Sequence, residues 1–185
     1  MRTHVNVRRA LGGLAAMLLL STIALLATVG PASAVGVVFT RIQNQGNLKC
    51  LQPENESQDE FARIVQVTCT QTGNRAFAQS WQHIDLGSNH FRFQNQLSGY
   101  CLDAFDGAFN GARLLQGTCV PISNEEFRTS AAPPGLVTIQ SRVGFRDTGF
   151  CIDVPGASSQ EGLAVQIFRC NGSVAQGFFH GFFTG

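Results

Sequence analysis

The stretch that decides the fold is CIDVPGASSQEGLAVQIFRCNGSVAQGF, residues 151–178. It holds two cysteines, an acidic residue two positions after the first, a Gly- and Ser-rich bend, and an alternating run before the second cysteine. A Gln-x-aromatic triplet, Gln176-Gly177-Phe178, ends it. Alternation of apolar and polar residues over a few positions is typical of a half-buried strand. The stretch therefore predicts short strands separated by a bend and closed by an aromatic core residue.

The same layout occurs twice more, earlier in the chain. The leading cysteines of the three copies are 51 and 50 residues apart, and the two cysteines within each copy are separated by 19, 18 and 19 residues. Such even phasing indicates a threefold internal repeat. The earlier copies consist of Cys50, Cys69 and Gln79-Ser80-Trp81, and of Cys101, Cys119 and Glu125-Glu126-Phe127.

Residues 1–34 have the features of a secretory signal peptide. Arginines at positions 2, 8 and 9 precede an apolar stretch from Leu11 to Val29, and Ala32-Ser33-Ala34 supplies small residues for cleavage. The apolar stretch approaches the length of a membrane span, so an uncleaved anchor is the alternative. The Ala-x-Ala ending favours cleavage. We expect a mature chain that begins at Val35 and is secreted into the extracellular space.

The mature segment, residues 35–185, has the size of one domain. It carries ten Lys and Arg (13 minus the three in the leader) against 12 Asp and Glu, a formal charge of about −2. It has no basic surplus for nucleic acid and no second apolar stretch for a membrane span after signal cleavage. We expect a monomer without a cofactor or metal.

All six cysteines lie in the mature segment, and export exposes them to an oxidising environment in which paired cysteines form disulfides. Fifteen pairings exist on paper. The repeat phase favours the local set, in which each bridge closes a loop that contributes roughly 3 kcal/mol to stability. A zinc site is the rival interpretation, but no CxxC or HxxxH spacing occurs. The expected bridges are Cys50–Cys69, Cys101–Cys119 and Cys151–Cys170.

Short apolar runs bounded by Gly, Asn, Asp, Ser and Pro fill the mature segment, which predicts an all-β barrel or sandwich. The repeats span about 37–86, 87–130 and 135–185, the third with an insertion around Val143 to Arg146. One repeat cannot bury its own apolar face, whereas three packed around a pseudo-threefold axis can. The apolar tail, 178–185, is expected to be the last strand, closing the barrel against the first; an exposed partner-binding tail is the alternative.

Together these motifs resemble the ricin-B-type lectin domains, which include the family 13 carbohydrate-binding modules. The similarity rests on the threefold phase, one cysteine pair per repeat, Cys-Leu/Ile-Asp, the run VQIFRCNG at 165–172, and Gln-x-Trp at 79–81. The resemblance implies a β-trefoil: three pseudo-symmetric repeats of four short strands, with shallow sugar pockets on the lobes. It also implies that Trp81 is a core residue.

The third repeat carries the best candidate sugar site. By resemblance, Asp153 is the acid that binds sugar hydroxyls and Phe168 the aromatic residue that stacks on the sugar. Gln166 shares a strand face with Phe168, because strand side chains alternate. Two positions depart from the family pattern, since Ala175 replaces an Asn and Phe replaces Trp or Tyr at 168, so we expect weak binding. Asn171 and Gln176 complete the predicted carbohydrate-binding set.

The other two repeats keep less of this set. The second retains Asp103 and Asn124, but Gly117 stands at the aromatic position, where Phe105 or Phe109 could substitute. The alternative role of Asp103 is a turn-capping carboxylate. The first repeat has Gln52 for the acid and Val67 for the aromatic residue, and we expect it to be structural.

The sequence argues against catalysis. A glycosidase needs two carboxyl groups within ~5–10 Å of each other, and the repeat phase places Asp103 and Asp153 on different lobes. Glu125 and Glu126 are adjacent and, in a strand, point to opposite sides. No His, Ser or Cys nucleophile motif is present in the mature segment.

The sequence thus predicts a secreted, non-catalytic, carbohydrate-binding lectin domain that acts mainly through its third repeat. Galactose- or xylose-type glycans, or a polysaccharide, are the expected partners, and nucleic acid is not. The alternative is a degenerate β-trefoil that binds protein, such as a protease inhibitor, or is purely structural.

Overall fold

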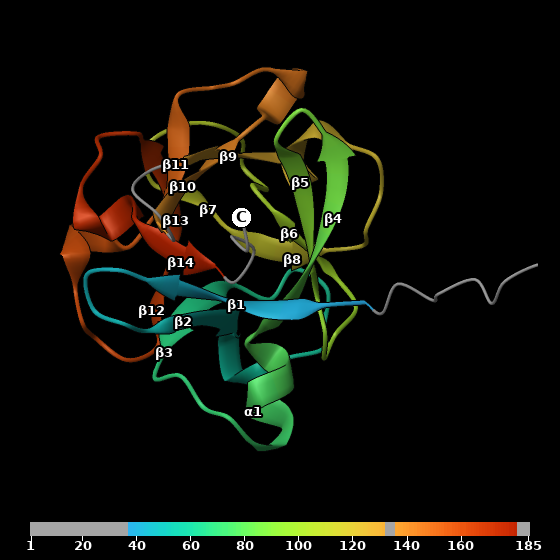
Figure 1. Ribbon diagram of the computed structural model, residues 1–185, viewed down its shortest axis with the longest axis vertical. Helices are drawn as coiled ribbons and strands as arrows, with labels where there is room; N and C mark the ends of the chain where they lie inside the picture. Colours follow the sequence, from blue (N-terminus) through green and yellow to red (C-terminus); the bar gives the residue numbers. More distant parts are fainter. Residues whose placement is uncertain (1–36, 132–135, 181–185) are drawn as a thin grey trace, which may run out of the picture. The chain divides into compact units, whose positions relative to one another are not determined.

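The computed structural model describes residues 37–131 and 136–180; the predicted leader and residues 181–185 lie outside this range. The unit from Gly36 onward is built almost entirely of short strands. In Figure 1 its first repeat lies at the bottom and its third at the left. The strands are β1 (Phe39–Asn44), β2 (Cys50–Pro53), β3 (Ile64–Val67), β4 (Ser80–Gly87), β5 (His90–Asn95), β6 (Cys101–Asp103), β7 (Ala112–Arg113), β8 (Leu115–Gly117), β9 (Phe127–Ala131), β10 (Leu136–Ser141), β11 (Phe150–Asp153), β12 (Leu163–Ala164), β13 (Gln166–Arg169) and β14 (Phe178–His180).

Six of these strands close into an antiparallel barrel. The first and last strands of each repeat pair in the circular order β1-β4-β5-β9-β10-β14-β1. Closure joins the first and last described strands, with Phe178 opposite Asn44, and Figure 1 shows β14 beside β1. The prediction that the C-terminal segment is the last strand is therefore confirmed for its described part, and closure leaves no free sheet edge in the barrel.

Three hairpins cap one end of the barrel, one from each repeat: β2–β3, β6–β8 and β11–β13. The third strand of the second repeat is interrupted at Leu114 and that of the third at Val165, so each is divided into two short pieces. The first piece pairs with the next hairpin around the axis, β7 with β13 and β12 with β3. The bridge from Arg63 to Leu115 completes this ring. The four-strand repeat of a β-trefoil is thus present three times.

Each hairpin is crossed by one disulfide, and all three bridges are the local ones expected from the sequence. The Cα atoms of the bridged cysteines are 5.0–5.1 Å apart. The bridges are Cys50–Cys69, Cys101–Cys119 and Cys151–Cys170.

The core lies on the pseudo-threefold axis and is filled by equivalent residues of the three repeats. The closing aromatic residues Trp81, Phe127 and Phe178 are fully buried, as are the apolar residues that follow the leading cysteines. The indole Nε1 of Trp81 donates to the carbonyl of Leu51 at 3.1 Å, so the buried polar atom of the ring is satisfied. Trp81 is a core residue, as the resemblance implied.

Three local features differ from or refine the sequence-based expectations. A short helix, α1 (Gly73–Ala78), precedes Gln79, although no helical period was visible there. The insertion in the third repeat forms a 3-10 turn over Val143–Phe145. Glu125 ends a 3-10 turn, Ser123–Glu125, rather than lying in a strand. Glu125 and Glu126 still diverge: one is buried and the other pairs with Arg142 at 2.7 Å.

Candidate functional site

The third lobe brings its predicted residues onto one face of the β11–β13 hairpin. Asp153 lies opposite Gln166, and Cys151 lies opposite Phe168. Because alternate residues of paired strands share a face, the acid, the amide and the ring point to the same side. Phe168 is half-buried, which leaves part of its ring accessible.

Two amides hold the carboxylate of Asp153. Nε2 of Gln166 donates to Oδ1 at 2.8 Å, and Nε2 of Gln176 donates to Oδ2 at 3.0 Å. Asp153 is 5 % exposed. A carboxylate has about four acceptor positions, so these two bonds fix its orientation and leave part of its acceptor capacity unused.

Gln176 supports Asp153 from behind. Its side chain is fully buried, donates a second bond to the carbonyl of Arg169 at 2.9 Å, and accepts from the backbone N–H of Asn171 at 2.7 Å. The side-chain oxygen of Asn171 accepts from the N–H of Ser173 at 2.9 Å and shapes its own turn. These two predicted residues therefore position the acid, while Gln166 and Phe168 lie beside it.

The second lobe is built differently around its acid, Asp103. A Cβ atom at Gly117 would lie 3.2 Å from Oδ2 of Asp103, so this position has no room for a ring without a shift. Phe105 instead packs edge-to-face on Phe61, with ring centroids 5.4 Å apart and both rings exposed. Phe61 comes from the first repeat, and sequence analysis missed it because the repeat phase does not show which loop lies over which lobe.

Two buried carboxyl groups occur together in the second lobe. Glu125 occupies the position of Gln176, so Asp103 has lost the amide donor that Asp153 retains. Within the described residues, Oδ1 of Asp103 and Oε1 of Glu125 have no hydrogen-bond partner. Burial raises the pKa of Asp103 to about 6. Burial, with the nearby charge of Asp103 adding, raises the pKa of Glu125 to about 7, against the opposing effects of the Val120 N–H and of Arg92.

Asn124, the other residue predicted for the second lobe, contacts its own chain. Its carbonyl accepts from the N–H of Ala104 at 2.9 Å. Its side-chain oxygen lies 3.4 Å from the hydroxyl of Ser123, which donates to it. Asn124 therefore joins the turn to the hairpin that carries Asp103.

The first lobe has neither acid nor ring, but it has a hollow. Gln52 accepts from Nε2 of Gln79 at 3.1 Å, which reproduces with two amides the Gln176–Asp153 bond of the third lobe. Beside Gln52 lies a cavity of about 190 Å³, lined also by Val67, Arg75 and Glu161. Arg75 is paired with Glu56 at 2.8 Å, so its charge is already neutralised.

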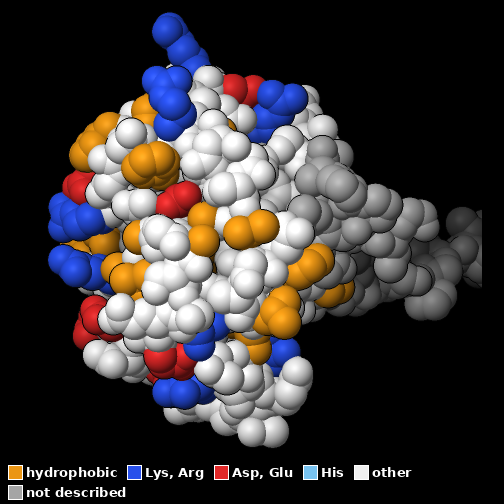
Figure 2. All heavy atoms as spheres, turned by 90° about the vertical axis from the view of Figure 1, so that its left-hand side faces the viewer, with side chains coloured by type: hydrophobic (Ala, Val, Ile, Leu, Met, Phe, Trp, Pro, Cys, Tyr) orange, Lys and Arg blue, Asp and Glu red, His pale blue; other side chains and the backbone are white. Residues whose placement is uncertain are grey.

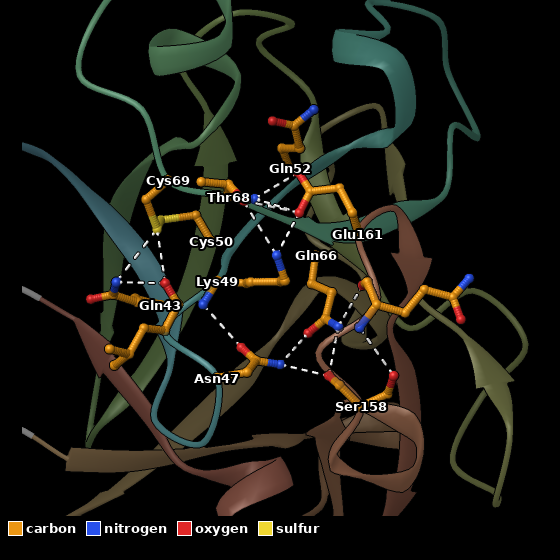
Figure 3. Close-up of polar contacts among 12 residues, drawn as sticks. Gln43, Asn47, Lys49, Cys50, Gln52, Gln66, Thr68, Cys69, Ser158 and Glu161 are labelled. Atoms are coloured by element: carbon orange, nitrogen blue, oxygen red, sulfur yellow. Dashed lines mark hydrogen bonds and ion pairs between the residues drawn. A yellow bond between two sulfur atoms is a disulfide. The ribbon is translucent and has the colours of Figure 1, made fainter.

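A loop of the third repeat closes over the first lobe, as Figure 3 shows. Glu161 accepts from the N–H of Thr68 at 2.8 Å and pairs with Lys49 at 2.5 Å. The buried amide of Gln66 donates to the carbonyls of Ser158 and Gln160 at 2.8 and 2.9 Å. These contacts, which we call the inter-repeat clamp, connect residues 92 to 112 positions apart and were not predicted from the sequence.

Equivalent contacts occur on the other two lobes, but with fewer hydrogen bonds. On the second lobe, Glu60 accepts from the N–H of Thr118 at 3.0 Å and Gln116 donates to the carbonyls of Ser57 and Asp59. On the third lobe, Asn110 accepts from the N–H of Arg169 at 2.9 Å, and Ile167 stands where the other lobes have the buried glutamine. The third lobe is therefore the one held least by its neighbouring loop.

Residues 37–131 and 136–180 contain no group of three or more His, Cys, Asp or Glu side chains that could hold a metal ion. The same residues form no helix with the length and apolar character needed to cross a membrane.

Similar proteins share this architecture. The designed threefold-symmetric protein ThreeFoil aligns with a TM-score of 0.70 at 22 % identity, covering 77 % of this chain and 96 % of its own. An exo-β-1,3-galactanase from Clostridium thermocellum aligns with a TM-score of 0.69 at 26 % identity, covering 79 % of this chain but only 30 % of its own. The C-terminal half of an earthworm R-type lectin, in complex with GalNAc, aligns with a TM-score of 0.61 at 17 % identity, covering 77 % of this chain and 96 % of its own.

No curated protein sequence matches the chain. The family model described as "Ricin-type beta-trefoil lectin domain-like" matches residues 32–117 and 77–168, two overlapping segments that span most of the chain. Fold, disulfides and repeat phase agree with that match. The chain belongs to the ricin-type β-trefoil lectin domain-like family.

Proposed function

We propose that this protein is a secreted, non-catalytic carbohydrate-binding domain whose main sugar site is the third lobe. The observation that carries the proposal is the arrangement of Asp153. Its carboxylate is oriented by two amides and lies on the same hairpin face as the half-buried ring of Phe168.

This arrangement suits the two surfaces of a sugar. A carboxylate that is already fixed can accept bonds from neighbouring hydroxyls, and such charge-assisted bonds are the strong ones. An aromatic ring covers the apolar C–H face at little cost in side-chain entropy. Gln166, bonded to Asp153, adds an amide that can donate and accept beside the same ligand.

The surface of the third repeat supports a polar ligand. Figure 2 shows the side of the unit that lies at the left in Figure 1, where apolar side chains form separate spots among polar groups and backbone. Surfaces that dock on other proteins usually carry a contiguous apolar patch. A small polar ligand fits this face better.

Galactose-type glycans are the first candidates for the ligand, with xylose-type glycans next. Two similar structures are a β-1,3-galactanase and an R-type lectin holding GalNAc. The two acids that lie together, Asp103 and Glu125 of the second lobe, are both buried, whereas Asp103 and Asp153 lie on strands β6 and β11 of separate hairpins. This separation supports binding without hydrolysis.

The proposal predicts that Asp153→Asn reduces glycan binding by roughly tenfold or more, the cost of one charged hydrogen bond. A glycan array containing galactose- and xylose-type glycans identifies the ligand, and retention on the immobilised glycan measures the loss. Phe168→Ala should act in the same direction because it removes the stacking surface.

Asp103→Asn is the matched variant in the second lobe and should reduce binding less than Asp153→Asn. Thermal unfolding monitored by circular dichroism verifies that each variant is folded. Loss of binding in Asp103→Asn with full binding in Asp153→Asn would show that the sugar site lies in the second lobe, and would contradict the proposal. Absence of binding by the wild type to every glycan would favour the protein-binding alternative.

A further inference from the structure

Three equivalent positions surround the axis where the capping hairpins meet. Six residues before the second cysteine of each repeat stand Arg63, Arg113 and Ala164. Each pairs with the hairpin of the next repeat: Arg63 with Leu115, Arg113 with Gln166, and Ala164 with Val65. Two of these three equivalent positions therefore carry a guanidinium group, and the third, Ala164, carries only a methyl group.

The two arginines differ in their partners. Asp106 neutralises Arg113, with 2.8 Å from Nε to Oδ2 and 2.7 Å from Nη2 to Oδ1. The residue equivalent to Asp106 in the first repeat is Asn55, five positions after the leading cysteine. The first repeat therefore has the cation, Arg63, but no carboxylate at the position equivalent to Asp106. Within the described residues the guanidinium of Arg63 has no ion pair.

A cavity of about 190 Å³ lies beside Arg63, where Ala164 leaves space. Its lining comes from all three repeats and includes Arg113, Pro155 and Gln166 as well as small apolar side chains. Gln166 connects this cavity to the candidate sugar site, because its Nε2 donates to Asp153. The cavity and the sugar site are therefore neighbours that share one side chain.

We propose that this cavity binds the anionic group of an acidic sugar, a carboxylate or a sulfate, whose ring occupies the Asp153–Phe168 site. The inference rests on the proposed carbohydrate-binding function and specifies its ligand class. A guanidinium presents a planar fork of donors that matches carboxylate and sulfate oxygens. Arg63 supplies the charge, and Gln166 joins the anion site to the hydroxyl-binding site.

The test compares neutral and acidic versions of one sugar. Wild-type protein is titrated with methyl galactoside, methyl galacturonide and galactose 6-sulfate at constant ionic strength, and binding is followed by NMR. The acidic sugars should bind roughly two- to fivefold more tightly, as expected for one solvent-exposed ion pair. The preference should shrink as salt is raised. A preference confined to galacturonide or to the sulfate identifies which anion the site takes.

Arg63→Gln should bring the ratio of acidic to neutral affinity to about one. Arg146→Gln removes an exposed positive charge of the third repeat that does not line the cavity, and should keep the wild-type ratio. Equal affinities of the wild type for neutral and acidic sugars would overturn this inference while leaving the proposed function in place. Failure of all three sugars to bind would also overturn this inference, and absence of binding to every glycan of the array would overturn the proposed function as well.

Discussion

At the scale of the residue, the three lobes differ in the chemistry of one equivalent pair of side chains. An amide donates to an amide in the first lobe and to a carboxylate in the third, at 3.1 and 3.0 Å. In the second lobe Glu125 replaces the amide, and two carboxyl groups occupy a site that requires a donor. Burial is the main cause of both raised pKa values, and for Glu125 the nearby charge of Asp103 adds to it.

This pair predicts a pH dependence of stability. The folded-state pKa values, about 6 for Asp103 and about 7 for Glu125, lie above the ordinary values of 3.8 and 4.5. Between these limits the folded state binds more protons than the unfolded state, so the free energy of unfolding falls as pH rises from about 4 to 8. Urea unfolding at pH 5 and pH 8 measures this fall.

Glu125→Gln restores an amide donor to Asp103 but removes the ion pair of Glu125 with Arg92 at 3.3 Å, so the free energy of unfolding at pH 8 should change by less than about 1 kcal/mol. It should also flatten the decline of stability between pH 5 and pH 8. Glu54→Gln, at an exposed acid, is the control and should keep the wild-type profile. An unchanged profile in Glu125→Gln would show that the two carboxyl groups do not interact.

At the scale of the element, the inter-repeat clamp converts three small hairpins into one structure. Each hairpin is held by its own disulfide and by a loop from another repeat, the strongest example being the loop at 158–161 on the first lobe. The glutamine at its centre is fully buried, so its bonds to carbonyl groups have no competition from water.

Replacing that glutamine tests the clamp. Gln66→Ala leaves the carbonyl of Gln160 without its side-chain donor and the carbonyl of Ser158 with Asn47 alone, so it should lower the free energy of unfolding by about 1–3 kcal/mol. Amide hydrogen exchange should increase in the loop at 158–161. Gln160→Ala, which changes only an exposed side chain of the loop, should have little effect on either measurement.

At the scale of the whole unit from Gly36 onward, closure of the barrel and the three bridges make its stability depend on the entire repeat set. Replacing both cysteines of one bridge, Cys101 and Cys119, by Ala should lower the free energy of unfolding by roughly 3 kcal/mol through the entropy of the unfolded chain. Peptide mapping under non-reducing conditions should recover three local bridges. A bridge between repeats would contradict the observed fold.

Much of this fold could be predicted because its constraints are periodic in the sequence. The regular spacing of the cysteines predicted the three disulfides. The apolar residues that follow the leading cysteines, such as Leu51 and Ile152, were predicted to lie in the core, and both are fully buried. The rest depends on contacts between repeats. Phe61 beside Phe105, and Arg63 beside the cavity, are placed by loops whose path across the axis no spacing reveals. Geometry was likewise needed to show that Gln166 is partly exposed beside Asp153, whereas Gln176 is buried behind it.

The central claim is that the third lobe binds sugar between a fixed carboxylate and a ring. A crystal structure of the protein with the glycan selected by the array tests this claim most directly. The account predicts a sugar ring over Phe168 with neighbouring hydroxyls on Asp153, while the bonds from Gln166 and Gln176 are retained. A glycan bound at another lobe, with the Asp153 face empty, would contradict it.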